Sequence, residues 1–196
     1  MKEFIKHAGD VQSAVASGNF EQTAEGILLP KMKALVRGKY RHRVNGGEWA
    51  EDHNLVTTEG LNYILNVVIG ATAKPAAWYV ALFSGATAPA AGWTAASFAG
   101  VAAEIVSTTE GFSGANRPTY VPGVAAGGIV SNTASRASFT IATASSLNVR
   151  GAAILSSQTR GSTSGVLLSA ATFATPRVFA NGDIFDCEYE LDLTAV

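Results

Sequence analysis

Charged residues are strongly concentrated at the N-terminal end of this sequence of 196 residues. Fifteen of its 29 charged side chains lie within residues 1–53, about a quarter of the chain. From residue 71 onward, alanine, glycine, serine and threonine dominate and are interrupted by short apolar runs, which is typical of short strands joined by turns. The sequence therefore predicts a polar N-terminal arm, residues 1–53, followed by one β-rich domain, residues 54–196.

Short apolar runs mark the expected strands of this domain. The run 78–83 is apolar throughout, which is typical of a central strand buried on both faces. Near the C-terminus, Cys187, Tyr189, Leu191 and Leu193 alternate with Asp186, Glu188, Glu190 and Asp192, a period of two that predicts one wet face. Further strand candidates are 104–107, 128–131, 136–142, 149–156, 165–170 and 183–193. This spacing predicts a mainly β fold, an antiparallel β-sandwich with one packed α-helix and an extended N-terminal arm.

The clearest hairpin signal is the pair Asn45 and Gly46, because these residue types supply the two positive φ angles of a type I′ turn. A two-residue loop at this place fixes a register, whose opposed pairs are Arg43 with Glu48, His42 with Trp49, and Tyr40 with Glu51. Opposed Arg and Glu, and an imidazole beside an indole, are favourable cross-strand pairs worth up to about 1 kcal/mol each. We therefore expect a basic hairpin within the arm.

The strongest helix signal lies between Thr57 and Ile69. Thr57 is a good N-cap, Glu59 suits the first turn, and Gly70 stands where the helix would end. The apolar stripe of this helix consists of Leu61, Ile64, Leu65 and Val68. We expect the helix to pack firmly on a sheet through this stripe.

The first 30 residues contain two apolar features. Phe4, Ala8, Val11 and Val15 recur at helical spacing, but the stripe is narrow, so a helix here needs another surface to be stable. The run Ile27-Leu28-Leu29-Pro30 follows, and its proline ends any preceding helix. We expect the arm to make mostly intermolecular contacts, with Phe4, Val11, Val15, Ile27, Leu28 and Leu29 as its apolar anchors.

Six basic residues and no acidic residue lie between positions 31 and 43. Such a stripe suits a nucleic acid, a lipopolysaccharide phosphate or an acidic protein surface, or simply forms the outer face of a hairpin balanced by nearby acids. The partner-binding candidates are Lys31, Lys33, Arg37, Arg41 and Arg43. The acidic face of Asp186, Glu188, Glu190 and Asp192 is their complement on a neighbouring copy. As a flat row it is a poor calcium cage, and a solvated strand face is favoured.

Catalysis and cofactor binding have little support in the sequence. The three histidines, His7, His42 and His53, lie in or beside the arm, and there is no GxSxG motif for a nucleophile. Glu104 and Glu110 are weak candidates for a glycosidase pair. One cysteine, Cys187, and three histidines show no zinc-binding spacing, and no glycine-rich loop fits a nucleotide phosphate. We therefore expect a protein that is not an enzyme and has no cofactor or metal.

The remaining composition narrows the partners. The formal net charge of -1 argues against a general nucleic-acid binder. The longest apolar-leaning stretch, residues 61–73, contains two asparagines and is shorter than the ~20 residues of a membrane span. The N-terminus lacks the uninterrupted apolar stretch of a signal peptide. We expect no nucleic-acid or membrane partner, and synthesis in the cytosol.

Several motifs, in their order and spacing, resemble those of small structural proteins of tailed bacteriophages. They are the segments Asn54–Leu65 and Trp78–Phe83, Gly92-Trp93-Thr94, Arg117-Pro118-Thr119-Tyr120, Arg177 with Asn181-Gly182-Asp183, and Ala24–Lys31 in the arm. The resemblance covers residues 24–193 and is to fibre-type and decoration-type virion proteins. It implies a non-enzymatic role in a particle that holds many copies.

Two functional hypotheses follow. The first is a phage virion accessory protein, a homo-oligomer assembled in the host bacterial cytoplasm and attached through residues 1–53 to a capsid, portal, neck or tail component. The second is a receptor- or glycan-binding module of a phage adhesion apparatus. Its loops would expose the aromatic residues Trp93, Phe98, Phe112 and Tyr120. A third, less favoured hypothesis is an enzyme that acts on cell-wall polymer.

Overall fold

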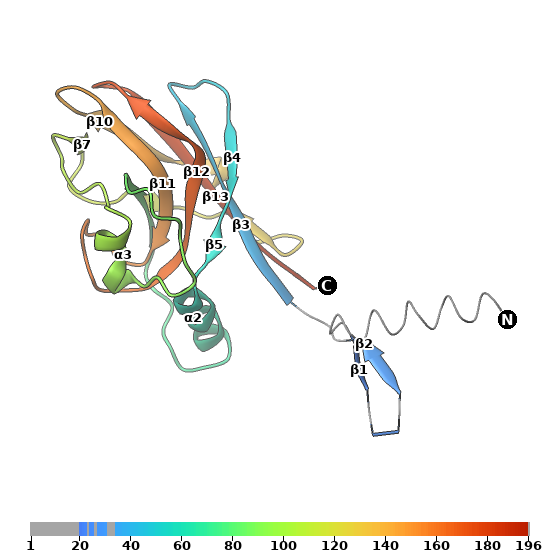
Figure 1. Cartoon of the computed structure of the whole chain (residues 1–196). Helices are drawn as coiled ribbons and strands as arrows, with labels where there is room; N and C mark the ends of the chain where they lie inside the picture. The colour runs from blue at the N-terminus through green and yellow to red at the C-terminus, as the bar shows by residue number, and fades with distance from the viewer. Residues whose placement is uncertain (1–19, 23, 26, 31–33, 196) are drawn as a thin grey trace. The chain divides into compact units, whose positions relative to one another are not determined.

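The structure is a computed structural model that describes residues 20–22, 24–25, 27–30 and 34–195 (Figure 1). The chain divides into two compact units, one made of residues 1–35 and 193–196 and the other of residues 36–192. Residues 36–53, which the sequence analysis placed in the arm, belong to the larger unit. They do so because most of β3 (Ala34–Val44) and all of β4 (Ala50–His53) are strands of its first sheet.

In the smaller unit, the described residues contain a short antiparallel hairpin. β1 (Phe20–Gln22) pairs with β2 (Leu28–Pro30), and Phe20 lies opposite Pro30. The run that begins at Ile27 is therefore extended, in agreement with the fixed φ of its proline. The helix expected over residues 4–15 lies outside the described residues.

The larger unit contains two antiparallel sheets. The first has the order β4-β3-β13-β10-β7, with β9 also paired to β13. Its remaining strands are β7 (Gly111–Phe112), β9 (Ile129–Ser131), β10 (Ala137–Ala142) and β13 (Ile184–Ala195). The second has the order β5-β12-β11-β6-β8, formed by β5 (Leu55–Val56), β6 (Trp78–Phe83), β8 (Thr119–Tyr120), β11 (Leu147–Leu155) and β12 (Leu167–Phe179). The fold is therefore mainly β and is the predicted antiparallel β-sandwich.

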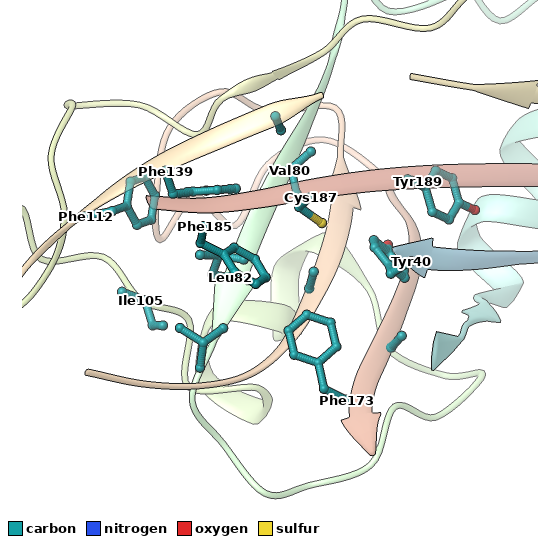
Figure 2. Packing of buried hydrophobic residues seen from close by; sticks show 14 of the residues in the cluster. Tyr40, Val80, Leu82, Ile105, Phe112, Phe139, Phe173, Phe185, Cys187 and Tyr189 are labelled. Carbon is teal, nitrogen blue, oxygen red and sulfur yellow. The ribbon is translucent and has the colours of Figure 1, made fainter. Parts of the chain in front are cut away.

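The main core lies between the two sheets (Figure 2). The first sheet contributes residues such as Tyr40, Phe139 and Phe185, and the second contributes Leu82 and Phe173. A hydrogen bond also connects the two sheets through this core, because the Tyr40 hydroxyl of β3 lies 2.9 Å from the Ser169 hydroxyl of β12.

In the second sheet, β6 is buried on both faces from Val80 to Phe83. In β6, Val80 and Leu82 belong to the core between the sheets, whereas Ala81 and Phe83 belong to a second cluster together with Phe98. Phe98 lies on α3 (Ala95–Val101), a short helix that sequence analysis did not predict. This arrangement confirms the prediction that residues 78–83 form a central strand without a wet face.

Most of the other strand predictions are close to the observed bounds, with two exceptions. Residues 104–107 form no strand, and only Glu104 makes an isolated bridge to Phe83. β12 extends nine residues beyond the predicted end at residue 170, with a register shift against β11 between Val149 and Gly151. A bulge of this kind lets a strand continue past a residue such as Pro176, which has no N–H to donate.

The hairpin formed by β3 and β4 has the predicted turn but not the predicted register. Asn45 and Gly46 have φ angles of 50° and 71°, and the Gly47 amide donates to the Val44 carbonyl at 2.8 Å. However, Arg41 pairs with Glu51 and His42 pairs with Ala50, so the register differs from the predicted one by one residue. The Gly47–Val44 hydrogen bond follows the predicted register, so the shift lies between Gly47 and Ala50, while the Asn45 side chain accepts from the Ile184 amide and donates to Asp183. A shift of one residue exchanges the two faces, so His42 is buried, away from Trp49.

The predicted helix is present as α2 (Thr58–Val68) and has the predicted N-cap. The Thr57 hydroxyl accepts from the Gly60 amide at 3.0 Å and donates to the Leu167 carbonyl. Glu59 does more than favour the first turn, because its carboxylate accepts from the amides of Ala95 and Leu167 at 2.8 and 2.6 Å. The start of α2 is thereby fixed to both α3 and β12.

Candidate partner-binding surfaces

Basic side chains of β3 lie beside acidic side chains of β13 on the outer face of the first sheet. Successive side chains of a strand alternate between faces, so every second residue of each strand shares this face. Four ion pairs join the strands: Arg37 with Asp192 at 3.1 Å, Lys39 with Glu190 at 3.6 Å, Arg41 with Glu188 at 3.0 Å, and Arg43 with Asp186 at 3.0 Å. We call these eight residues the ion-pair ladder.

Neighbouring side chains extend the ion-pair ladder. Glu51 of β4 lies 3.2 Å from Lys39, and this hydrogen bond is the main reason why the pKa of Lys39 is raised. Arg136 lies 3.4 Å from Asp186. The guanidinium groups of Arg41 and Arg43 lie over the Trp49 ring at 5.1 and 4.6 Å from its centroid. The ladder therefore neutralises most of its charge within the chain.

This pairing changes the interpretation of both charged rows. The sequence analysis placed the acidic complement on a neighbouring copy, whereas the structure pairs the two rows within one chain. It also favoured a solvated acidic face, but Asp186 and Glu188 are buried. Asp186 accepts from Ser138 at 2.6 Å and Glu188 from Thr133 at 3.4 Å. A partner-binding role for Arg37, Arg41 and Arg43 stays a prediction, and Lys31 and Lys33 lie outside the described residues.

The four aromatic residues expected in exposed loops are all buried, so that expectation is wrong. Trp93 and Phe98 pack edge-on against Phe83 beneath α3. The Phe112 and Phe139 rings pack edge-on in the main core with centroids 4.8 Å apart, and the Tyr120 hydroxyl donates to the Tyr189 carbonyl at 3.3 Å. Large aromatic side chains near turns in a short-stranded protein are needed to fill the core, and the four provide no platform for a glycan.

The apolar residues of the arm are only partly described. Ile27 is 57% exposed. Leu28 and Leu29 lie in β2. Phe4, Val11 and Val15 lie outside the described residues, and their role as partner anchors stays a prediction.

The stripe of α2 that was expected to be buried is mostly exposed. Leu61, Leu65 and Val68 are 36%, 61% and 70% exposed, and Ile69, which follows the helix, is 83% exposed. These four residues form what we call the α2 apolar face. Of the predicted stripe, Ile64 is partly buried and packs against the main core, and Gly60 brings the helix close to β12, where a Cβ atom would stand 2.4 Å from the Leu168 carbonyl oxygen. A glycine contact brings the helix backbone close to the sheet at its first turn, and the prediction of a buried Leu65 is wrong.

A sequence signal for the α2 apolar face does exist. A helix that covers a sheet normally carries charged side chains on its outer side. The run from Gly60 to Ala73 contains no Asp, Glu, Lys or Arg. The absence of a charged outer face therefore indicates a helix with apolar residues on more than its buried side.

An apolar pocket of about 190 Å³ adjoins the α2 apolar face. It is lined by Tyr63, Ile64, Val67 and Val68 of α2, by Lys74, Pro75 and Trp78, and by Leu168 and Leu191. Val68 belongs both to this lining and to the exposed face. The pocket and the face therefore form one continuous apolar surface.

The acidic and histidine residues considered for catalysis have structural partners. Both carboxylate oxygens of Glu104 accept from the buried Arg117 guanidinium at 2.7 and 2.8 Å. Glu110 accepts from the Thr143 hydroxyl and the Ala144 amide, which lower its pKa. His42 lies 2.9 Å from Asp52, and burial lowers its pKa, so the neutral imidazole donates from Nε2 to the carboxylate. These groups tie segments of the fold together.

Two classes of site can be examined directly in the described part of the chain. No group of three or more His, Cys, Asp or Glu residues within residues 34–195 and the short described segments before them is placed to hold a metal ion. The helices that the structure describes are too short and too polar to cross a membrane. Burial raises the pKa of the Cys187 thiol, which therefore stays protonated at neutral pH.

A protein-family model matches most of this chain. The family described as "Podophage GP4 fiber I protein gp80" matches residues 55–191, which is more than half of the chain. No curated protein matches this sequence. The matched region begins at β5 and ends within β13, so it contains all of the second sheet and both α2 and α3.

Proposed function

Because this chain belongs to the podophage GP4 fiber I protein gp80 family, we propose that it is a multi-copy accessory subunit of a phage fibre, anchored to the virion by its N-terminal arm. Family membership makes it a fibre-type structural protein of a phage particle. In the proposed role it catalyses no reaction. Its partners are copies of itself and a capsid, neck or tail component, and it is assembled in the host cytoplasm.

The observation that carries this proposal is the contrast between the family region and the arm. The family match covers residues 55–191, whereas residues 1–54 lie outside it. Within those first residues, β3 and β4 belong to the first sheet, which leaves residues 1–33 as the segment available for attachment. Ile27 is 57% exposed, so this segment offers a partner protein an apolar side chain to bind.

Deletion of residues 1–30 tests the anchoring role. The truncated chain should keep the circular dichroism spectrum and unfolding midpoint of the sandwich, because the two main sheets lie outside the deletion. Particles assembled in host cells that supply only this variant should contain little or none of it, as measured by mass spectrometry of purified virions. An unfolded truncated chain, or normal occupancy in particles, would contradict the proposal.

A further inference from the structure

The α2 apolar face exposes four aliphatic residues that adjoin one another along the chain or on one helix. We propose that the α2 apolar face binds the same face of a second copy of this chain. This inference rests on the proposed multi-copy role and identifies the surface through which copies meet.

Charge favours a second copy over a different partner. An interface between two copies of one surface brings two sets of the same charges together, and only an arrangement that opposes unlike charges avoids repulsion; a face with few charges meets its own copy without that requirement. No charged residue lies between Gly60 and Ala73, and Lys74 is the one charged residue in the lining of the adjoining pocket, so this surface carries little charge to repel its own copy. The formal net charge of -1 also leaves little overall repulsion between copies.

Shape supports the same conclusion. A two-fold contact must be self-complementary, so that one surface carries both a projection and the recess that receives it. Leu65 of α2 and Ile69, which follows the helix, are strongly exposed and supply the projection, and the adjoining pocket of about 190 Å³ supplies the recess. Apolar cavities of about 150 Å³ are known to hold benzene, so the pocket has room for one aliphatic side chain from a second copy.

The size of the surface predicts the strength of the contact. Four partly exposed aliphatic residues present on the order of 400 Å², the size at which an exposed apolar patch often marks an interaction site. Two copies would bury about 800 Å² in total, less than the about 1,200–2,000 Å² of a stable interface. The contact should therefore be weak between isolated chains and strengthened where many copies are held in one particle.

Sedimentation equilibrium of the full chain, from about 1 μM to about 1 mM, tests this contact in the range expected for weak association. Val68→Asp places a charge on the α2 apolar face, and Val178→Asp is a matched control on β12, because the two valines are 70% and 68% exposed. The wild-type chain and Val178→Asp should associate as concentration rises. Val68→Asp should raise the dissociation constant at least tenfold with an unchanged circular dichroism spectrum. Equal association of both variants would overturn the inference.

Cross-linking identifies the surface on the second copy. Ile69→Cys introduces an exposed thiol, whereas the native Cys187 is buried and does not compete for the reagent. A short bis-maleimide should produce covalent dimers of Ile69→Cys and none of Val178→Cys. Association without an Ile69→Cys dimer would show that α2 meets another surface, and the inference would be wrong.

The outcome is separable from that of the proposed function. A wild-type chain that stays monomeric at all concentrations but enters particles normally overturns the α2 contact and leaves the fibre role intact. If the chain associates through α2 but enters particles normally without its arm, the anchoring role of the arm is wrong and the α2 contact stands.

Discussion

The ion-pair ladder and the α2 apolar face are two surface regions of the same sandwich, and they differ in whether their side chains have partners within the described chain. In the ladder, basic and acidic side chains distant in sequence meet on neighbouring strands and neutralise each other. On α2, aliphatic side chains that a helix would normally bury stay exposed, because Gly60 forms the contact with β12. Charge density alone is therefore a poor guide to partner surfaces, because charged side chains can form ion pairs within their own chain. An exposed apolar face is not satisfied within the described chain.

The largest expected effect concerns the ion pair that is completely buried. The side chains of Arg117 and Glu104 are 0% and 1% exposed, and Arg117 also donates to the Ser157 carbonyl. Arg117→Ala leaves a buried carboxylate without its counter-ion, so the free energy of unfolding should fall by about 3–5 kcal/mol in urea titrations. The double variant Arg117→Met with Glu104→Leu should lose less than Arg117→Ala alone, because no buried charge remains. If the double variant loses as much, packing and not charge holds these loops.

The next largest effect is expected from a comparison of the two sides of α2, the Gly60 side that meets β12 and the exposed side that carries Leu65. Gly60→Ala should destabilise the chain by about 1–3 kcal/mol, because the added Cβ meets the Leu168 backbone, although alanine is the better helix former by about 1 kcal/mol. Leu65→Ala removes a much larger side chain, yet it should change the free energy of unfolding of the isolated chain by less than about 0.5 kcal/mol. Urea denaturation of dilute samples measures both. A larger loss for Leu65→Ala would mean that this helix packs through its aliphatic stripe after all.

Local signals in the sequence were sufficient for several elements and failed for their packing. The Thr57 cap, the positive φ angles of Asn45 and Gly46, and the apolar run 78–83 each depend on a few consecutive residues, and all three were predicted. The register of the β3–β4 hairpin was not, because it shifts by one residue between Gly47 and Ala50, and the turn signal at Asn45 and Gly46 does not extend that far. The presence and the approximate limits of α2 were predictable from the sequence, but the side of α2 that faces the sheet was not.

The candidate surfaces show the same limit. Neighbouring strands β3 and β13 come from opposite ends of the sequence, so the ion-pair ladder could not be distinguished from a contact between copies. Trp93, Phe98, Phe112 and Tyr120 lie next to turn-forming residues, a position that is compatible with exposed loops and with core filling. The sequence analysis expected the stripe of α2 to be buried, although the long uncharged run after Gly60 is a signal from which the α2 apolar face could have been predicted.

The inner face of β3 carries a buried titratable group, the His42 imidazole, which lies 2.9 Å from the Asp52 carboxylate. His42 stacks on Phe173 with ring centroids 3.9 Å apart, and burial is the main cause of its lowered pKa. Arg177 lowers the pKa further, while Asp52 raises it. The unfolded chain therefore binds this proton more readily than the folded chain.

Stability should consequently fall as the pH drops below about 6.5, the ordinary pKa of histidine, by at most about 1.4 kcal/mol per pH unit for this one proton. Above that pH the contribution is fully present. Urea denaturation between pH 7.5 and pH 5.5 measures the slope, and His42→Gln should reduce it. His53→Gln is the control, because His53 is exposed and its removal should leave the slope unchanged. Equal slopes for the wild-type chain and His42→Gln would show that His42 is not the group responsible.

A small effect is also expected at the exposed end of the ion-pair ladder. The side chains of Arg37 and Asp192 are 56% and 20% exposed, whereas those of Arg43 and Asp186 are 20% and 10% exposed. An exposed pair is screened by solvent and salt, so Arg37→Ala should cost less than about 1 kcal/mol and nothing measurable at about 1 M salt. Arg43→Ala also loses its position over Trp49 and leaves Asp186 partly buried, so it should cost more, about 1.5–3 kcal/mol, and depend less on salt. Urea titrations of both variants at low and high salt give the comparison. If the two losses are equal and equally sensitive to salt, the ladder is a solvated surface feature along its whole length and remains as open to a partner as its sequence first indicated.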